Sequence, residues 1–408
     1  MYWYLSRARS GSRSAATRCF RRCCVLLLVV CCFPAREAAS AHSQPPAELS
    51  ETTEYRVLSQ NWWPRKGTAS SGAYAGASAC RQCHADEAST QPRTPMANAS
   101  YHSAVSNWGA KLSAATGSSG PYFYRVVPHA HEANLIVSSG NQSITADITW
   151  TFGAGVRGQT FILENNGTTY DSQVSSFPGL HDGMAITPGH PPAKAGDLHK
   201  ALGARLDPQM AARCFGCHTT NSTMNDQFDP QQAIPGIQCE SCHGPGLAHV
   251  VAANMNLVED AKALIFSPHS LSPVESVDFC GACHMTPADV AESDFFGPNN
   301  VRFQPYRLEK SRCWGVRGDE RLVCSACHNP HQPVAHEARF YDQRCLGCHR
   351  SSDAQAQNQG ASAPGICPKA TANCTTCHMP KYDVPEMHAK FTDHFIRIVR
   401  PGEAYPAR

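Results

Sequence analysis

One five-residue pattern, Cys-x-x-Cys-His, occurs seven times in this 408-residue sequence. With cysteine and histidine each near one residue in twenty, chance would supply only about 0.05 copies of a pattern that is typical of covalent c-type haem attachment. The paired thiols are Cys80, Cys83, Cys214, Cys217, Cys239, Cys242, Cys280, Cys283, Cys324, Cys327, Cys345, Cys348, Cys374 and Cys377. The histidines that follow them are His84, His218, His243, His284, His328, His349 and His378. The repetition therefore indicates a specific chemistry rather than an accident of composition.

The spacing suits one haem per motif. Two thiols separated by two residues can add to the two vinyl groups of one porphyrin and form two thioether bonds. The adjacent histidine is then delivered to the iron as the proximal axial ligand, one of the means by which a protein tunes haem. The sequence predicts seven covalently attached haem c groups, and it assigns no residue a catalytic role.

Two other uses of the cysteines explain less of the pattern. Zinc binds Cys-x-x-Cys pairs, but a tetrahedral site combines two such pairs, or one pair with spaced histidines. It does not require a histidine directly after every second cysteine. A set of disulfides would suit an exported chain, yet it gives the seven histidines no role.

Twelve of the 20 histidines remain once the seven in the motifs and His42 are set aside. This supply is ample for distal ligands, so the number alone does not show whether every iron is six-coordinate. His331 comes three residues after its own motif, in CSACHNPH, from which it could reach the iron of another haem. The candidates for the distal axial position are His249, His331, His394, His388, His190, His102 and His199.

Residues 1–41 have the features of a secretory signal peptide. Six arginines precede an apolar run, Cys23 to Phe33, that is too short to span a bilayer, and Ala39-Ser40-Ala41 offers a small-residue cleavage site. We expect a periplasmic or extracellular, cell-surface location, with no transmembrane span after cleavage. An uncleaved amphipathic anchor is the alternative.

Two cysteines remain after five of the 21 are assigned to the leader and fourteen to the motifs. They are Cys313 and Cys367. In an oxidising compartment such a pair suggests a disulfide. Two free buried thiols are the alternative.

The formal net charge of +2 comes from the leader. Removing its seven arginines and Glu37 leaves 28 basic and 32 acidic residues, a balance of −4. This balance gives no indication of nucleic-acid binding. Redox proteins, or a membrane quinol-linked electron donor, are the expected partners, met through local charged patches.

The remaining chain divides by composition into four parts. Residues 42–73 are rich in Ala, Ser, Pro and Gly and predict a flexible tether, and residues 74–118 form a first haem segment. Residues 119–180 hold short β-branched and aromatic runs, which predict a small antiparallel β insertion of about four to six strands. Asn165-Asn166-Gly167 predicts a hairpin within it. Residues 181–408 form a six-haem cytochrome c domain, in which residues 249–266 are expected to be helical.

Haem density limits the architecture of this last part. Six motifs lie within the 165 residues from Cys214 to His378. So short a segment cannot build an ordinary core around each porphyrin, so the porphyrins themselves must supply the buried apolar surface. The predicted fold class is mainly α and irregular coil wrapped around a covalent haem cluster, with the small antiparallel β insertion between the first and second haems.

The order of the longer motifs resembles a known family. AYAGASACRQCHADE with the later TPM, GIQCESCHGPGLAHV, CSACHNPH, and CTTCHMP with HAKFTDHFIR together resemble the bacterial multihaem c-type cytochromes. This includes members whose haem packing is like that of the tetrahaem cytochromes of ammonia oxidisers, and the resemblance covers residues 73–400. It implies periplasmic or cell-surface electron transfer through predominantly bis-histidine haems.

The leading functional hypothesis is an exported heptahaem c-type cytochrome that transfers electrons between periplasmic or membrane redox partners. The alternative is a multihaem reductase or oxidase of a small nitrogen or sulfur compound, which needs one iron with an open site. The first haem is the best suspect for that role, because about 130 residues and the β insertion separate it from the second motif.

Overall fold

A computed structural model describes residues 73–103, 115–129, 132–181, 183–224, 227–293, 297–315, 318–349, 367, 369–400 and 402–405. All seven motifs lie within these ranges. The predicted signal peptide, the tether before Ala73, His42 and His131 lie outside them. In the described part of the chain, no helix combines the length and apolar character needed to cross a membrane.

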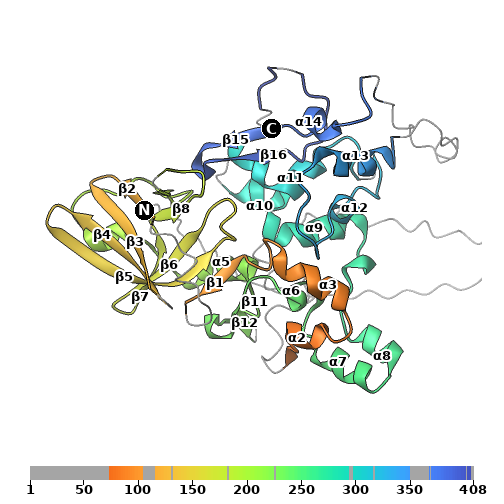
Figure 1. The fold of residues 1–408 in the computed structure, drawn as a ribbon, viewed down its shortest axis with the longest axis horizontal. Coiled ribbons are helices and arrows are strands. Elements are labelled where there is room, and N and C mark those ends of the chain that lie inside the picture. Colours follow the sequence, from red (N-terminus) through yellow and green to blue (C-terminus); the bar gives the residue numbers. More distant parts are fainter. Residues whose placement is uncertain are drawn as a thin grey trace, which may run out of the picture. The chain divides into compact units, whose positions relative to one another are not determined.

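An eight-stranded antiparallel sheet is the largest element (Figure 1). Its strands follow the order β10-β7-β6-β5-β4-β3-β2, and β1 pairs with β5 beside this path. The strands are β1 (Ser100–His102), β2 (Thr116–Ser119), β3 (Tyr122–Pro128), β4 (Ala133–Ser139), β5 (Gln142–Phe152), β6 (Thr160–Asn165), β7 (Thr168–Ser172) and β10 (Gly203–Arg205).

The expected fold class, mainly α with a small β insertion, is therefore wrong. The sheet reaches from Ser100 to Arg205, beyond both ends of the predicted insertion. β1 and β10 have three residues each and β2 has four. Segments this short show no period-two pattern, so only their pairing with longer strands reveals them as part of the sheet.

Alternating side chains give the sheet its own core. In β3 and β4, every second residue is buried near the start of the strand, which is the pattern of a half-buried strand. The core they join contains Tyr124, Val126, Leu135, Val137, Ile148, Phe161 and Leu163. The hairpin predicted at Asn165–Gly167 is confirmed: β6 and β7 pair across it, and Asn166 and Gly167 have φ values of 50° and 73°.

A register shift in β5 turns the end of this strand toward a second core. The shift lies between Ile148 and Trp150, where β5 pairs with β6. Ile148 belongs to the main core, whereas Trp150 and Phe152 pack with Phe215 in a separate cluster. A β-bulge re-aims side chains in this way. The sheet thereby contacts the helix that carries the second motif.

Short helices and four two-stranded pairings make up the rest of the described chain. The helices are α2 (Ala77–Cys80), α3 (Ala85–Thr90), α4 (Leu198–Ala201), α5 (Pro208–His218), α6 (Cys239–His243), α7 (Leu247–Asn254), α8 (Val258–Ala263), α9 (Pro273–His284), α10 (Pro287–Glu292), α11 (Gln304–Glu309), α12 (Cys324–Cys327), α13 (Ala338–Leu346) and α14 (Cys374–His378). Turns of 3₁₀-helix are η2 (Gln91–Arg93), η4 (Pro230–Gln232), η5 (Pro268–Ser270), η6 (Gly297–Arg302) and η8 (Pro385–Met387). The pairings are β8 (Val174–Ser176) with β9 (Met184–Ile186), β11 (Thr219–Thr220) with β14 (Ile234–Pro235), β12 (Thr223–Met224) with β13 (Gln227–Phe228), and β15 (Lys381–Val384) with β16 (Ala389–Thr392).

Local signals explain where the longer helices begin and break. α5 and α9 both start with a capping side chain, Asp207 and Ser272 respectively, followed by proline at the first helical position. The helix expected over 249–266 is instead the pair α7 and α8. Asn256 lies in the break with a φ of 58°, a left-handed conformation that ends a helix.

We predict that the sheet owes its stability to the side-chain core. Leu135→Ala should lower the free energy of unfolding by about 2–5 kcal/mol, because Leu135 is fully buried and truncation leaves a cavity. Urea denaturation followed by the strand signal in circular dichroism measures the change. Phe123→Ala is the matched control, since Phe123 lies in β3 with 47% of its surface exposed. Equal losses for the two variants would contradict the assignment of this core.

Candidate haem-binding sites

Each motif lies on a short helix or at its end. Motifs two and four end α5 and α9 with their histidines, motifs three and seven form α6 and α14, and motif five occupies α12. Motif one begins at the last residue of α2, and motif six begins within α13. Residues three apart lie on the same face of a helix. A single turn therefore presents both thiols of a motif to one side.

Three motif histidines face a second histidine from elsewhere in the chain. The ring centroids are 6.3 Å apart for His84 and His249, with an interplanar angle of 26°. They are 6.0 Å apart at 12° for His243 and His331, and 6.2 Å apart at 39° for His328 and His394. Three of the seven predicted distal candidates are thus opposite a motif histidine.

This spacing fits two imidazoles on opposite faces of one iron. A metal–nitrogen bond is about 2 Å long and each nitrogen lies about 1 Å from its ring centre, so the two centroids would be about 6 Å apart. Imidazoles in direct contact would be closer, and unrelated ones would show no common distance. The donor set of these three pairs therefore fits a six-coordinate haem iron.

Backbone carbonyls orient three motif histidines, of which His243 belongs to one of these pairs. The Nδ1 atoms of His218, His243 and His378 donate to the carbonyl oxygens of Ala99, Phe266 and Arg397, at 3.0, 3.0 and 2.9 Å. A carbonyl oxygen can only accept, so the proton must lie on Nδ1 and the lone pair on Nε2. Such a bond fixes the tautomer that a metal requires.

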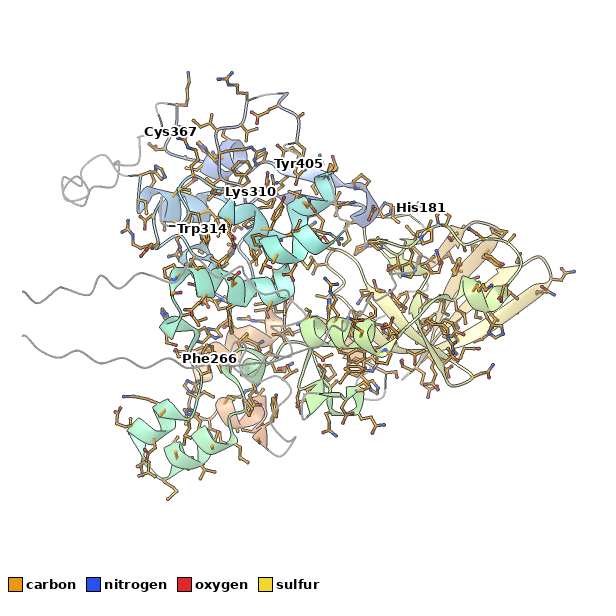
Figure 2. The ribbon with its side chains drawn as sticks, turned by 180° about the vertical axis from the view of Figure 1, so that it is seen from behind. His181, Phe266, Lys310, Trp314, Cys367 and Tyr405 are labelled. Atoms are coloured by element: carbon orange, nitrogen blue, oxygen red, sulfur yellow. The ribbon has the colours of Figure 1, made fainter. Side chains whose placement is uncertain are left out.

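Two of the distal candidates are oriented in the same way. His249 Nδ1 donates to the carbonyl oxygen of Ala261 at 2.8 Å, which also ties α7 to α8. His394 Nδ1 donates to the carbonyl oxygen of Thr392 at 3.1 Å. One ring of each histidine pair, namely His249, His243 or His394, therefore has a backbone carbonyl that orients it. Figure 2 labels Phe266, whose carbonyl oxygen orients His243.

The structure places the other four distal candidates elsewhere. His190 lies 3.1 Å from the carboxylate of Asp171, and His102 packs edge-on against Trp150 with centroids 4.5 Å apart. His199 is exposed on α4, and His388 is exposed beside Phe177. His129 and His181, the latter labelled in Figure 2, are exposed as well.

Burial keeps the central histidines neutral, which is the form that binds a metal. Burial and the neighbouring His328 lower the pKa of His394 to about 4. The pKa of His284 is also lowered, by burial first and then by His218, although a hydrogen bond with Gln304 opposes the shift. His284 ends α9 close to His218 and His328, and the residue is exposed to solvent. An axial ligand that faces a planar group would have this environment.

Cysteines of different motifs approach one another closely. Side-chain hydrogen bonds link Cys80 with Cys239, and Cys280 with Cys324, in each case raising the pKa of the first thiol and lowering that of the second. Cys345 and Cys374 are also within hydrogen-bonding reach. Motifs one and three, four and five, and six and seven are therefore immediate neighbours.

The second motif is held between the sheet and the fourth motif. The Ser100 hydroxyl donates to the carbonyl oxygen of His218 at 2.7 Å, and Phe152 stacks on the His218 ring with centroids 5.2 Å apart. Cys217 Sγ lies 3.5 Å from the carbonyl oxygen of Ala282, which is in α9. The bulged end of β5 and strand β1 thus position this motif.

Sequence reasoning missed several buried charged side chains that join the motifs. Asp342, 5% exposed, accepts hydrogen bonds from the backbone N–H groups of Asn373 and Cys374 at 2.7 and 2.8 Å. Burial raises the pKa of Asp342, but these hydrogen bonds lower it by more, so the net shift of the pKa is downward. Asp342 precedes the sixth motif and Cys374 begins the seventh. The only sequence signal is an acidic residue three positions before a motif cysteine.

A buried ion pair lies beside the distal candidate His394 and the segment that orients the motif histidine His378. Arg307 binds both carboxylate oxygens of Asp393, at 2.8 and 2.9 Å, and these side chains are 1% and 0% exposed. Arg397 donates to the same carboxylate at 2.7 Å, and its carbonyl oxygen orients His378. Asp393 directly precedes His394. This pair therefore fixes the C-terminal segment that supplies one distal candidate and supports one motif histidine.

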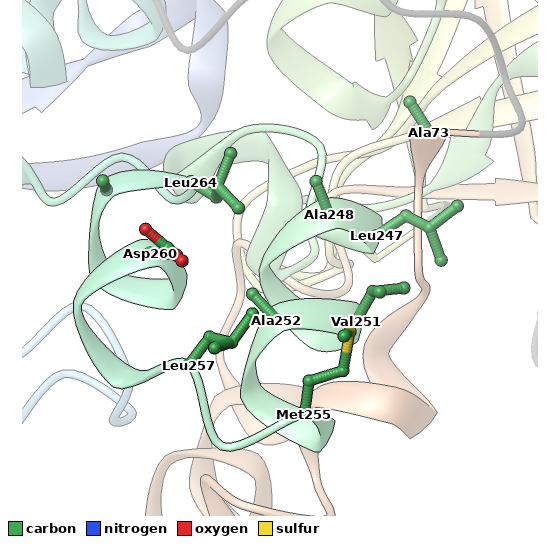
Figure 3. A pocket seen from close by; sticks show the side chains of 10 residues that line it. Ala73, Leu247, Ala248, Val251, Ala252, Met255, Leu257, Asp260 and Leu264 are labelled. Atoms are coloured by element: carbon green, nitrogen blue, oxygen red, sulfur yellow. The ribbon is translucent and has the colours of Figure 1, made fainter.

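An apolar pocket lies between α7 and α8 (Figure 3). It has a volume of about 780 Å³ and is lined by residues that include Leu247, Val251, Met255 and Leu264. His249 is not among the lining residues, although its neighbours Ala248 and Ala252 are.

The two cysteines outside the motifs are not joined. Both Cys313 and Cys367 are free thiols, so the structure does not form the disulfide that the sequence suggested. Cys313 is partly buried near Cys345 and Cys348, and burial raises its pKa. Cys367 is exposed (Figure 2). In the described ranges, no cluster of three or more His, Cys, Asp or Glu side chains could hold a bare metal ion.

Comparison with known proteins found three similarities. The model of the family "Cytochrome c554 and c-prime" matches residues 181–244, which contain the second and third motifs. The multiheme cytochrome MtrA of Shewanella baltica (strain OS185) is 23% identical over 196 residues, which is 43% of this chain and 54% of MtrA. The chain thus spans about half the length of this curated relative. The outer cell wall cytochrome OcwA has a TM-score of 0.46 and 15% identity, with coverage of 81% of this chain and 80% of OcwA.

The family match, the curated relative and the repeated motifs all show a similarity to bacterial multihaem c-type cytochromes. This similarity implies covalently bound haem c.

We predict that the Arg307–Asp393 pair stabilises the C-terminal part of the fold. Asp393→Asn should lower the free energy of unfolding by about 3–5 kcal/mol, because it leaves a buried guanidinium without its counter-charge. Asp383→Asn is the control, since Asp383 pairs with Lys390 at 3.5 Å with both side chains mostly exposed, and its loss should cost about 0–1 kcal/mol. Thermal unfolding of the holo-proteins compares them, and similar stabilities would contradict the prediction.

Proposed function

We propose that the chain is an exported heptahaem c-type cytochrome that transfers electrons through closely packed, mostly bis-histidine haems. The observation that carries the proposal is the set of three histidine pairs whose ring centroids are 6.0–6.3 Å apart. Haem c supplies the one-electron chemistry. The residues of the chain attach it, orient its ligands and bring neighbouring sites together.

Seven motifs would each hold one haem by two cysteines and a proximal histidine. His249 would complete the iron held by His84, His331 the iron held by His243, and His394 the iron held by His328. In this assignment the fifth motif segment, CSACHNPH, holds one haem and donates His331 to the third. Donation between segments draws attachment sites together, which suits electron transfer over short steps.

The contacts between helices support a continuous series of sites. α2 contacts α6, α9 contacts α12, α12 contacts α13, and α13 contacts α14. Cys242 and Cys283 pack in one apolar cluster, which joins the third motif to the fourth. α5 contacts α9, so the second motif branches from the fourth. The proposed order is one, three, four, five, six, seven, with two beside four.

Location and partners follow from the sequence. The predicted leader supports export to the periplasm or cell surface, and the balance of −4 after its removal supports docking to redox proteins rather than to nucleic acid. A membrane quinol-linked donor is a second partner class of the same kind. The first haem was the best suspect for the open iron of the enzymatic alternative, and the His84–His249 pair supports a sixth ligand there instead.

The test is a haem count together with low-temperature electron paramagnetic resonance of the holo-protein. We expect seven haems per chain by pyridine haemochrome and low-spin signals throughout. Fewer than seven would mean that some motifs are not used. A stoichiometric high-spin signal that shifts with nitrite, hydroxylamine or sulfite would favour the multihaem reductase or oxidase.

We predict that His331→Ala opens one iron. The holo-protein should keep its haem count, because the thioether bonds do not involve His331, but one haem should change from low to high spin. After reduction it should bind one carbon monoxide per chain more than the wild type. His336→Ala is the control, since His336 is five residues further on and exposed. Wild-type spin states in His331→Ala would contradict the ligand assignment.

A further inference from the structure

Glu240 is a buried acidic residue between the two cysteines of the third motif. It is 3% exposed, and its carboxylate accepts three backbone hydrogen bonds. Oε1 accepts from the N–H groups of Ala75 and Gly246, both at 2.8 Å, and Oε2 accepts from Gly76 at 2.9 Å. One side chain therefore joins three segments of the chain.

Both of the other segments lead to a ligand of the first iron. Ala75 and Gly76 directly precede α2, which ends at Cys80 of the first motif, and His84 follows. Gly246 is the residue before α7, in which His249 lies. The two histidines that face one another at 6.3 Å are thus tied to the same carboxylate. The Cys80–Cys239 contact lies beside this junction.

The local backbone is built for this contact. Gly76 has a φ of 78°, a conformation that L side chains rarely adopt. It is the residue directly before α2, and its N–H donates to the carboxylate. A Cβ atom at Gly246 would lie 3.2 Å from Glu240 Oε1, which is closer than ordinary packing allows. Glycine is therefore favoured at position 76 by its backbone conformation and at position 246 by the close approach of the carboxylate.

We propose that Glu240 is a positioning residue for the first haem: it fixes His84 and His249 on opposite sides of the iron and holds motifs one and three adjacent. This rests on the proposed function, because it needs a haem at the first motif. Glu240 acts from another motif without contacting the iron. The third motif thereby sets the ligand geometry of the first.

A carboxylate is required because all three partners are donors. A glutamine side chain offers one acceptor oxygen and one NH₂ group, which is itself a donor. Whichever way the amide is turned, at least one backbone N–H then faces another donor in a buried site. Glu240→Gln keeps the size of the side chain, so a change in the haem signals would come from these hydrogen bonds rather than from a cavity.

The experiment compares full-length holo-proteins with Glu240→Gln, His249→Ala and the control Glu259→Gln. Glu259 lies in α8, the helix that follows α7, and its side chain is 86% exposed. The measurements are the haem count, the low-temperature resonance spectrum and the binding of carbon monoxide after reduction. We expect Glu240→Gln to alter one low-spin signal and to bind one carbon monoxide per chain more than the wild type. His249→Ala should do the same, and Glu259→Gln should match the wild type.

The double variant Glu240→Gln/His249→Ala tests whether both residues act on one iron. One extra carbon monoxide per chain is expected, because coupled residues are not additive. Two would place the effect of Glu240 on a different haem and overturn the assignment. Should Glu240→Gln not yield holo-protein, Glu240→Asp retains the charge with a shorter reach, and partial binding at the same haem is expected.

The haem count separates the two proposals. A wild-type protein with fewer than seven haems would fail the proposed function whatever Glu240 does. Seven haems together with wild-type resonance and carbon monoxide binding in Glu240→Gln would overturn the positioning role and leave the proposed function standing.

Discussion

Pairs of imidazole rings held about 6 Å apart are the constraint on which the described helical part depends. Each pair joins a residue of a motif to a residue far along the chain, as His328 and His394 illustrate. The local helical turn orients the cysteines, but only tertiary contacts can place the opposite ring. A backbone carbonyl orients one ring of each pair, namely His249, His243 or His394. The numerous short helices and loops are arranged so that these pairings can be made.

The protein divides its stabilisation between two kinds of core. The sheet buries its own side chains, with Tyr124 and Leu135 at its centre. In the helical part the buried apolar clusters are small, such as Phe279 and Ala282 with their neighbours, and motif cysteines lie at their edges. Burial of an apolar group stabilises in proportion to its area, so under the proposed function haem groups would supply there what side chains supply in the sheet. The bulged end of β5 joins the two, since Phe152 stacks on His218.

The sequence was most informative where the chemistry is local. Each motif, and the turn of the Asn166-Gly167 hairpin, is defined by a few adjacent residues. The fold class was wrong because β1, β2 and β10 are too short to carry a pattern and exist through pairing alone. His249, His331 and His394 each lie near a motif or in the C-terminal tail and face a motif histidine. His102, His190, His199 and His388 satisfied the same sequence criteria and lie elsewhere, because which rings meet is decided by long-range contacts.

The buried charges show the same limit. Glu240, Asp342 and Asp393 have no periodicity or motif of their own, and their roles follow from partners more than 30 residues away for Asp342 and more than 80 for the other two. A carboxylate that accepts backbone N–H groups can be recognised only once the folded chain shows which donors surround it. These residues convert a series of separate attachment sites into a connected arrangement.

The position of the sheet in the chain has a consequence for maturation. Its strands lie almost entirely between the first and second motifs, and its core contains no motif cysteine. It can therefore fold from its own side chains while the later thiols are still accessible for covalent modification. Ala99 and Ser100, at its edge strand β1, already offer the carbonyl and hydroxyl that receive His218. The sheet can thus serve as a template that directs the order in which the modified segments assemble.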